Sequence, residues 1–245
     1  MADAKNVEVD IKALYEAGVH FGHKTSRWHP KMAPYIHSKR GDAHIINLEA
    51  TVEALEKALP FITKTVASGK KVLFVGTKKQ AKDAVRAAAE SCEQPYVVER
   101  WVGGMLTNTD TISRQIRKLR DLENRMASGD LEKRYNKLEV LRFQEEIDKL
   151  NLKYSGIKEL SGQPGALIVT DILTDHNAIA EARKLQIPVI ALVDSNANPD
   201  GIDYPIPAND DALKGISLLL NYFVAAVNLG RVSEKAAPAK KVEGK

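Results

Sequence analysis

Several features are scarce or missing in this chain of 245 residues, and each limits what the protein can be. A single cysteine, Cys92, excludes an internal disulfide framework and fits a reducing compartment. The first ten residues hold acidic side chains and no apolar run, so we expect no secretory signal. The longest apolar-rich segment, residues 216–229, is too short and too polar to cross a bilayer. We therefore expect a cytoplasmic protein without a membrane anchor.

Sequence motifs for nucleotide-dependent or nucleophilic catalysis are also missing. The chain has no GxxxxGK[ST] phosphate-binding loop, no GxGxxG fingerprint and no GxSxG turn. Cys92 lies in an alanine-rich, helical stretch, where a cysteine is far more often buried than reactive. We predict that the protein is not an enzyme and has no small-molecule substrate.

Acidic residues are absent from residues 19–41, which we call the basic block. In a chain with 32 acidic residues, this gap leaves local positive charge unneutralised. Cations pair with phosphates and aromatic rings stack on bases, so the mixture favours RNA as a partner. The alternative is a solvated basic loop whose aromatic rings close the edge of a core. The candidate RNA-binding residues of the block are Lys24, Arg27, Trp28, Lys31, Lys39 and Arg40.

Two further loops carry candidate RNA contacts. Residues 76–80 follow an apolar run and open a helical pattern, so backbone amides there, with Lys78 and Lys79, favour an anion. In residues 100–108, paired glycines allow close approach of the backbone. We expect Trp101 to pack in the core, whereas Arg100 fits a phosphate contact and a structural role equally well.

Short apolar runs alternate with helical patterns, which predicts an α/β domain with a parallel sheet covered on both faces. A helix with one apolar face is expected over residues 52–66, ending at Gly69, and a last, mostly apolar helix over residues 211–229. The strand candidates are residues 44–47, 72–75, 96–98, 166–170 and 189–193.

One segment, residues 107–154, has no strand signal. Two apolar stripes at helical spacing, separated by a turn at residues 127–130, predict an antiparallel helical hairpin that projects from the sheet. The alternative is a pair of surface helices lying on the domain. Arg114 and Arg117 of the first helix are added as candidate RNA contacts. The tail, residues 231–245, has no periodicity and is predicted to be disordered.

Acidic residues gather where strands are expected to end. In a doubly wound sheet the carboxyl ends of the strands are where ligands lie. Asp194 and Asp210, together with His23 or the neighbouring His20, have the ligand types that suit zinc. The simpler interpretations are a helix N-cap for Asp210 and a turn residue for Asp194. We predict His23, Asp194 and Asp210 as a metal site.

At several places the sequence resembles the family of the bacterial small-subunit ribosomal protein number two. The resemblance begins with the run AGVHFGH at residues 17–23, followed by Arg27-Trp28 and the run PKM at residues 30–32. It covers residues 10–231, with blocks in the family's order. Later blocks are residues 45–48, 74–80, 100–108, 156–158, 187–188, 193–194, 206–207 and 209–211.

The resemblance implies a flavodoxin-like, three-layer α/β/α domain over residues 8–230, interrupted by a protruding antiparallel coiled-coil hairpin at residues 107–154. It implies a structural role in the small ribosomal subunit during translation, with ribosomal RNA and neighbouring ribosomal proteins as partners. One such neighbour is the large multi-domain ribosomal protein number one. The resemblance implies no required cofactor, and the predicted metal site adds a structural zinc ion to this expectation.

Two other classes of function compete with this interpretation. A metal-dependent enzyme on a flavodoxin-like sheet would use Asp194 and Asp210. A scaffold that binds only proteins would use the hairpin. Association with the small ribosomal subunit distinguishes the first interpretation from both alternatives.

Overall fold

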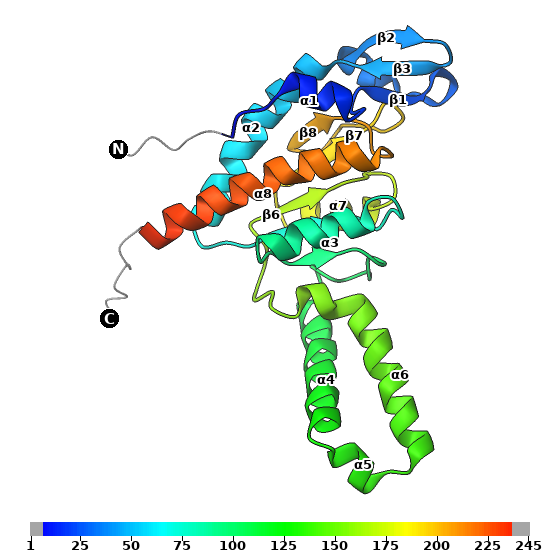
Figure 1. Cartoon of the computed structure of the whole chain (residues 1–245), viewed down its shortest axis with the longest axis vertical. Coiled ribbons are helices and arrows are strands. Elements are labelled where there is room, and N and C mark those ends of the chain that lie inside the picture. The colour runs from blue at the N-terminus through cyan, green and yellow to red at the C-terminus, as the bar shows by residue number, and fades with distance from the viewer. Residues whose placement is uncertain (1–6, 237–245) are drawn as a thin grey trace.

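The computed structural model describes residues 7–236, and its centre is a five-stranded parallel sheet (Figure 1). The strands are β4 (Val72–Val75), β5 (Tyr96–Val97), β6 (Ala166–Val169), β7 (Val189–Val193) and β8 (Tyr204–Pro207). Their order across the sheet is β5-β4-β6-β7-β8, and every neighbouring pair is parallel. This is the flavodoxin-like order, in which the chain reverses direction across the sheet between β4 and β6. The predicted fold class is confirmed.

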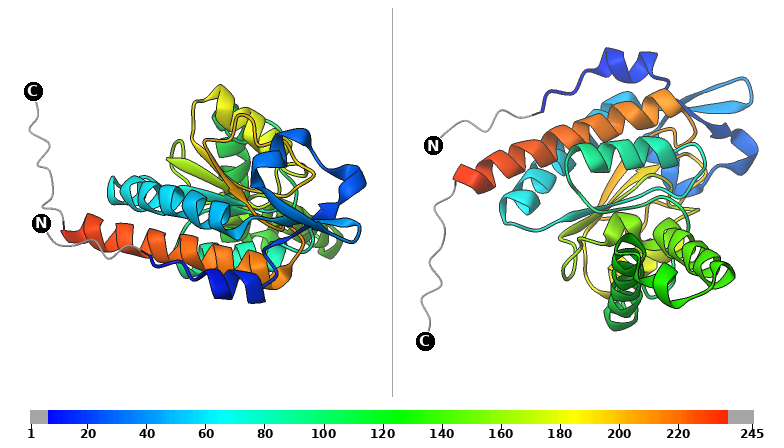
Figure 2. Two further views of the ribbon diagram at one scale, coloured as in Figure 1. Left: turned by 90° about the horizontal axis from the view of Figure 1, so that it is seen from above. Right: turned by 60° about the horizontal axis from the view of Figure 1, so that its bottom comes forward.

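Helices cover both faces of the sheet, as the apolar strands require. On one face lie α2 (Leu48–Ala67), α3 (Lys82–Ser91) and α8 (Leu213–Ala236), with α2 and α8 side by side (Figure 2). On the other face lie α7 (His176–Lys184) and the base of the hairpin. Strand β4 shows the alternation: Phe74 faces the first layer, whereas Leu73 and Val75 face the second.

The N-terminal part of the chain forms a second, smaller sheet. Strands β1 (Phe21–Lys24), β3 (Ala43–Ile46) and β2 (Ile36–Arg40) are antiparallel, with β3 in the centre. The short helix α1 (Ile11–Glu16) precedes them, and two 3-10 turns, η1 (Thr25–Arg27) and η2 (Pro30–Tyr35), join β1 to β2. The prediction that residues 44–47 belong to the parallel sheet is wrong, because β3 pairs with its sequence neighbours. The fifth parallel strand is β8, which the sequence analysis did not predict because it contains two prolines. Prolines are tolerated here because β8 is an edge strand.

The predicted hairpin is present and projects from the domain (Figure 1). It contains α4 (Thr109–Ala127), the short α5 (Asp130–Arg134) and α6 (Lys137–Tyr154), and the turn η3 (Ser155–Ile157) returns the chain to the sheet. The second helix is interrupted at Tyr135, and α6 restarts with a capping box between Asn136 and Glu139. Coiled-coil packing of α4 on α6 stays a prediction.

Helix α8 is longer than the sequence predicted. Its segment Leu213–Glu234 meets the length and composition of a membrane span, a test that core helices of soluble proteins also pass. Here Leu219, Phe223 and Val227 are buried in the core that α8 shares with α2 and α3. The prediction of disorder is wrong for residues 231–236, which continue α8, whereas residues 237–245 lie outside the described residues.

Candidate nucleic-acid interface and metal centre

The basic block lies at the carboxyl edge of the parallel sheet, held by the loop after β7. The backbone N–H of His23 donates to Oγ of Ser195 at 2.8 Å, and that of His29 donates to the Ser195 carbonyl at 2.8 Å. Gly22 allows this approach, because a Cβ there would meet Ser195 Oγ at 2.7 Å. The block therefore has a fixed position relative to the sheet.

Most of the predicted cations of the block are exposed and have no acidic partner. Among the described residues, no carboxylate forms an ion pair with Lys24, Arg27, Lys39 or Arg40. Lys31 differs, since it pairs with Asp200. Such unpaired surface cations are suited to binding phosphates.

The two lysines of the loop after β4, Lys78 and Lys79, have different surroundings. Lys79 is exposed, but Nζ of Lys78 lies 2.6 Å from Oδ1 of Asp210 and 2.7 Å from Oδ1 of Asp211. The predicted anion position is filled from within the chain, because Thr77 donates from its backbone and hydroxyl to the buried Asp175 carboxylate, at 3.1 and 2.7 Å. We therefore assign Lys78 a structural role and retain Lys79 in the proposed RNA surface.

The loop after β5 also contains one structural and one exposed residue. Trp101 is buried as predicted, and its Nε1 donates to Glu181 at 3.0 Å. Glu181 also accepts from the backbone of Gly104 at 2.7 Å and of Leu106 at 3.0 Å. Sequence reasoning missed Glu181, since nothing in the helical pattern of α7 marks it as a partner of a loop distant in sequence. Arg100 is exposed beside this rigid loop.

Arg114 and Arg117 lie on the exposed side of α4. Each donates from Nε to a backbone carbonyl one turn earlier, at 3.3 Å, and neither forms an ion pair with a described carboxylate. Lys118, by contrast, pairs with Glu146 across the hairpin. The two arginines thus extend the set of unpaired cations onto the hairpin.

The three predicted metal ligands converge. One ligand atom from each of His23, Asp194 and Asp210 lies within 4.8 Å of the others. Nδ1 of His23 is 3.1 Å from Oδ2 of Asp194, and its Nε2 is 3.3 Å from Oδ2 of Asp211. Strands β7 and β8 both end here, so the topology brings the two aspartates together, and the docked β1 adds the histidine. One imidazole with two carboxylates fits zinc chemically.

Electrostatics at this cluster reflect the crowding of carboxylates. Burial, together with Asp194 and Asp171, raises the pKa of Asp210 to about 6 against the opposing effect of Lys78. The hydrogen bond to Asp194 raises the pKa of His23. Burial alone would lower the pKa of Lys78, but its hydrogen bonds to Asp210 and Asp211 outweigh burial and raise it. Lys78 and His23 therefore partner the buried carboxylates of the cluster.

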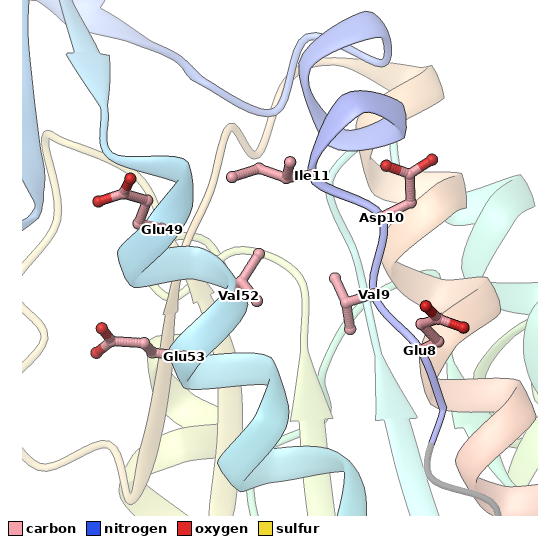
Figure 3. A pocket seen from close by; sticks show the side chains of 7 residues that line it. All are labelled: Glu8, Val9, Asp10, Ile11, Glu49, Val52 and Glu53. Carbon is pink, nitrogen blue, oxygen red and sulfur yellow. The ribbon is translucent and has the colours of Figure 1, made fainter.

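A separate groove lies between the N-terminal segment and the start of α2 (Figure 3). The side chains of Val9, Ile11 and Val52 lie between the two segments, and acidic residues of both segments stand at the margins of the groove. Ile11 and the nearby Tyr15 are exposed. The carboxylates are those of Glu8, Asp10, Glu49 and Glu53. This combination is suited to a protein segment with basic and apolar side chains, and it repels RNA.

Comparison with known proteins gives a consistent result. The model of the family described as Ribosomal protein S2 matches residues 14–230. Small ribosomal subunit protein uS2 of Pseudoalteromonas atlantica is 48% identical over 236 residues, covering 96% of each chain. The protein of that name from Pasteurella multocida is 48% identical and covers 91% of this chain and 93% of its own. That from Rickettsia rickettsii is also 48% identical, covering 93% of this chain and 77% of its own.

Proposed function

The chain belongs to the ribosomal protein S2 family, and from this membership we propose that it binds small-subunit ribosomal RNA through the exposed cations of its basic block. Proteins of this family are structural constituents of the small ribosomal subunit and act in the cytoplasm, as parts of a ribonucleoprotein. They need no cofactor and are not enzymes. The alternative of a metal-dependent enzyme using Asp194 and Asp210 is therefore wrong.

One observation supports the RNA surface most strongly: Lys24, Arg27, Lys39 and Arg40 are exposed without carboxylate partners on a rigidly docked segment. Side chains held on a fixed scaffold lose less freedom when they bind phosphate. Lys79, Arg100, Arg114 and Arg117 are proposed as additional contacts around this surface.

Sedimentation of the small subunit from cells tests this function. Wild-type chain and a variant with Lys24, Arg27, Lys39 and Arg40 changed to Gln are each expressed with a tag. The control carries Gln at four exposed lysines outside the block, Lys57, Lys64, Lys70 and Lys184. We expect the block variant to leave the sedimenting subunit at lower salt than the control. Equal release of both variants would contradict the proposal.

We also propose protein neighbours for this chain, including the large multi-domain ribosomal protein number one. The acidic and apolar groove supports contact with protein rather than RNA, as its carboxylates repel phosphate. The exposed leucines Leu138, Leu141 and Leu152 of α6 provide a second apolar surface, at the projecting hairpin.

A structural zinc ion at His23, Asp194 and Asp210 is our finer proposal for the metal centre. The convergence of one imidazole and two carboxylates supports it. When bound, zinc would tie the basic block to the sheet. Elemental analysis of untagged protein, never exposed to chelator, tests this: we expect near-stoichiometric zinc, and less than about a tenth of an equivalent contradicts it.

A further inference from the structure

His44 is a buried side chain whose polar ring nitrogens are not satisfied by its neighbours. It lies on β3, the central strand of the small sheet, with 1% of its surface exposed. Neither Nδ1 nor Nε2 has a hydrogen-bond partner among the described residues. A neutral imidazole has one donor and one acceptor, and burying both unpaired costs free energy that an apolar side chain would avoid.

Trp28 covers His44. Their ring centroids are 5.4 Å apart, with the planes tilted by 40°. Trp28 follows the turn η1 and is 39% exposed, so its indole lies between the orphaned imidazole and solvent. The other tryptophan is different, because Trp101 is 8% exposed and donates to Glu181. Trp28 therefore has the exposed ring that base stacking requires.

The charge around this pair suits a nucleotide. Lys39 of β2 is opposite His44 in the antiparallel register, so the two side chains share one face of the sheet. Arg40 and Lys24 are opposite Ala43, the residue before His44, so their side chains lie on the other face of the small sheet. Burial and the charge of Lys39 lower the pKa of His44, which keeps the imidazole neutral and able to both donate and accept. A phosphate held by Lys39 would bring a base to the Trp28 ring.

We propose that Trp28 and His44 form a capture site for one unpaired RNA base, with the base stacked on the indole and its edge hydrogen-bonded to the imidazole. This proposal rests on the proposed RNA-binding function. It adds a contact with an RNA base to the phosphate contacts of the exposed cations. The indole shifts from its position over His44 when the base enters, which frees an imidazole nitrogen for the base edge. The orphaned nitrogens are then satisfied only in the complex.

The test compares an RNA with and without bases. Full-length protein is titrated with a single-stranded RNA of about twelve nucleotides, a length within the usual site size of single-strand binders. The second probe is the same backbone with abasic nucleotides, and both affinity and tryptophan emission are followed. We expect the base-containing strand to bind about tenfold more tightly and to change the emission, because base stacking is a substantial part of such affinity. Trp28→Ala should bind both strands with similar affinity. It should also lose the emission change, because its remaining tryptophan, Trp101, is buried.

His44→Leu separates base reading from folding. We expect this variant to bind the base-containing strand about fivefold more weakly, a loss in the range of one base contact. Its salt dependence should be unchanged, and its melting temperature equal or higher because the unpaired nitrogens are gone. The control, His37→Leu, changes an exposed histidine of β2 and should leave base discrimination intact.

Each remaining outcome overturns the proposal in a distinguishable way. Equal binding of both strands without an emission change removes the base site and leaves RNA binding through phosphates in place. No binding of either strand removes both this site and the proposed RNA function. A His44→Leu variant that discriminates bases like His37→Leu excludes His44 from base contact.

Discussion

Nζ of Lys78 lies 2.6 Å from Oδ1 of Asp210 and links the end of β4 to the end of β8 at the carboxyl edge of the sheet. In flavodoxin-like sheets this edge usually receives a ligand. Here the Lys78 ammonium contacts Asp210 beside the proposed zinc site, and this ion pair holds the loops after β4 and β8 together. The position of Lys78 at the carboxyl edge of the sheet agrees with the structural role of the family.

We predict that Lys78→Met destabilises the fold by about 3 kcal/mol, since it leaves the buried Asp210 without its partner. The neighbouring exposed substitution Lys79→Met should change the free energy of unfolding by less than about 0.5 kcal/mol. Urea unfolding of both variants measures the difference. Similar free energies would mean that Lys78 is not structural.

The sequence predicted the parallel sheet well because its strands are buried on both faces and therefore read as continuous apolar runs. It predicted Asp194 and Asp210 at one edge because parallel strands end together. It did not predict that Lys78 faces inward, because the local sequence does not distinguish a solvent-exposed lysine from one that is paired with carboxylates. Asp210, one partner of Lys78, is 132 residues away along the chain, a separation that no local pattern reports.

The protonation of His23 should make stability depend on pH. Hydrogen bonding to Asp194 raises its folded pKa above the unfolded value of about 6.5. The stability from protonated His23 is then fully present below that pH and is lost as pH rises through the folded pKa. With chelator present, the advantage of wild type over His23→Gln in urea unfolding should shrink between about pH 6 and pH 8. A pH-independent difference would contradict this.

The protonation of Asp210 should also make stability fall as pH rises, but over a lower pH range than His23. Its pKa is raised to about 6, so between roughly pH 4 and pH 6 the folded state holds a proton that the unfolded state has released. Stability relative to Asp210→Asn should fall as pH rises through that window. Chelator-treated protein, unfolded in urea at several pH values, gives the slope, and a rise in relative stability there would refute the assignment.

Glu181 should be the main support of the loop that carries Arg100. Replacing it by Gln leaves one acceptor oxygen and adds an amide donor, so either Trp101 and Gly104 or Leu106 lose their acceptor, which we expect to cost about 2 kcal/mol. Glu159→Gln, at a 91% exposed side chain, is the control and should cost little. Thermal unfolding followed by Trp101 fluorescence measures both variants, and equal losses of stability would show that Glu181 does not support this loop.

The outer part of the hairpin should be dispensable for folding. Lys118 and Glu146 pair across it, so their backbones are close enough to be joined by a short glycine linker replacing residues 119–145. Met105 and Ile157 pack with the sheet and stay in the shortened chain. We expect cooperative thermal unfolding to persist. A broad, non-cooperative transition would show that the hairpin tip stabilises the sheet.

The salt dependence of binding to purified small-subunit ribosomal RNA tests the central claim most directly. Each phosphate contact contributes about 0.7–0.9 to the slope of log affinity against log salt. Changing Lys24, Arg27, Lys39 and Arg40 to Gln should lower that slope by about 3, whereas the matched change at Lys57, Lys64, Lys70 and Lys184 should leave it near wild type. Equal slopes for wild type and the block variant would show that the basic block does not contact RNA phosphates.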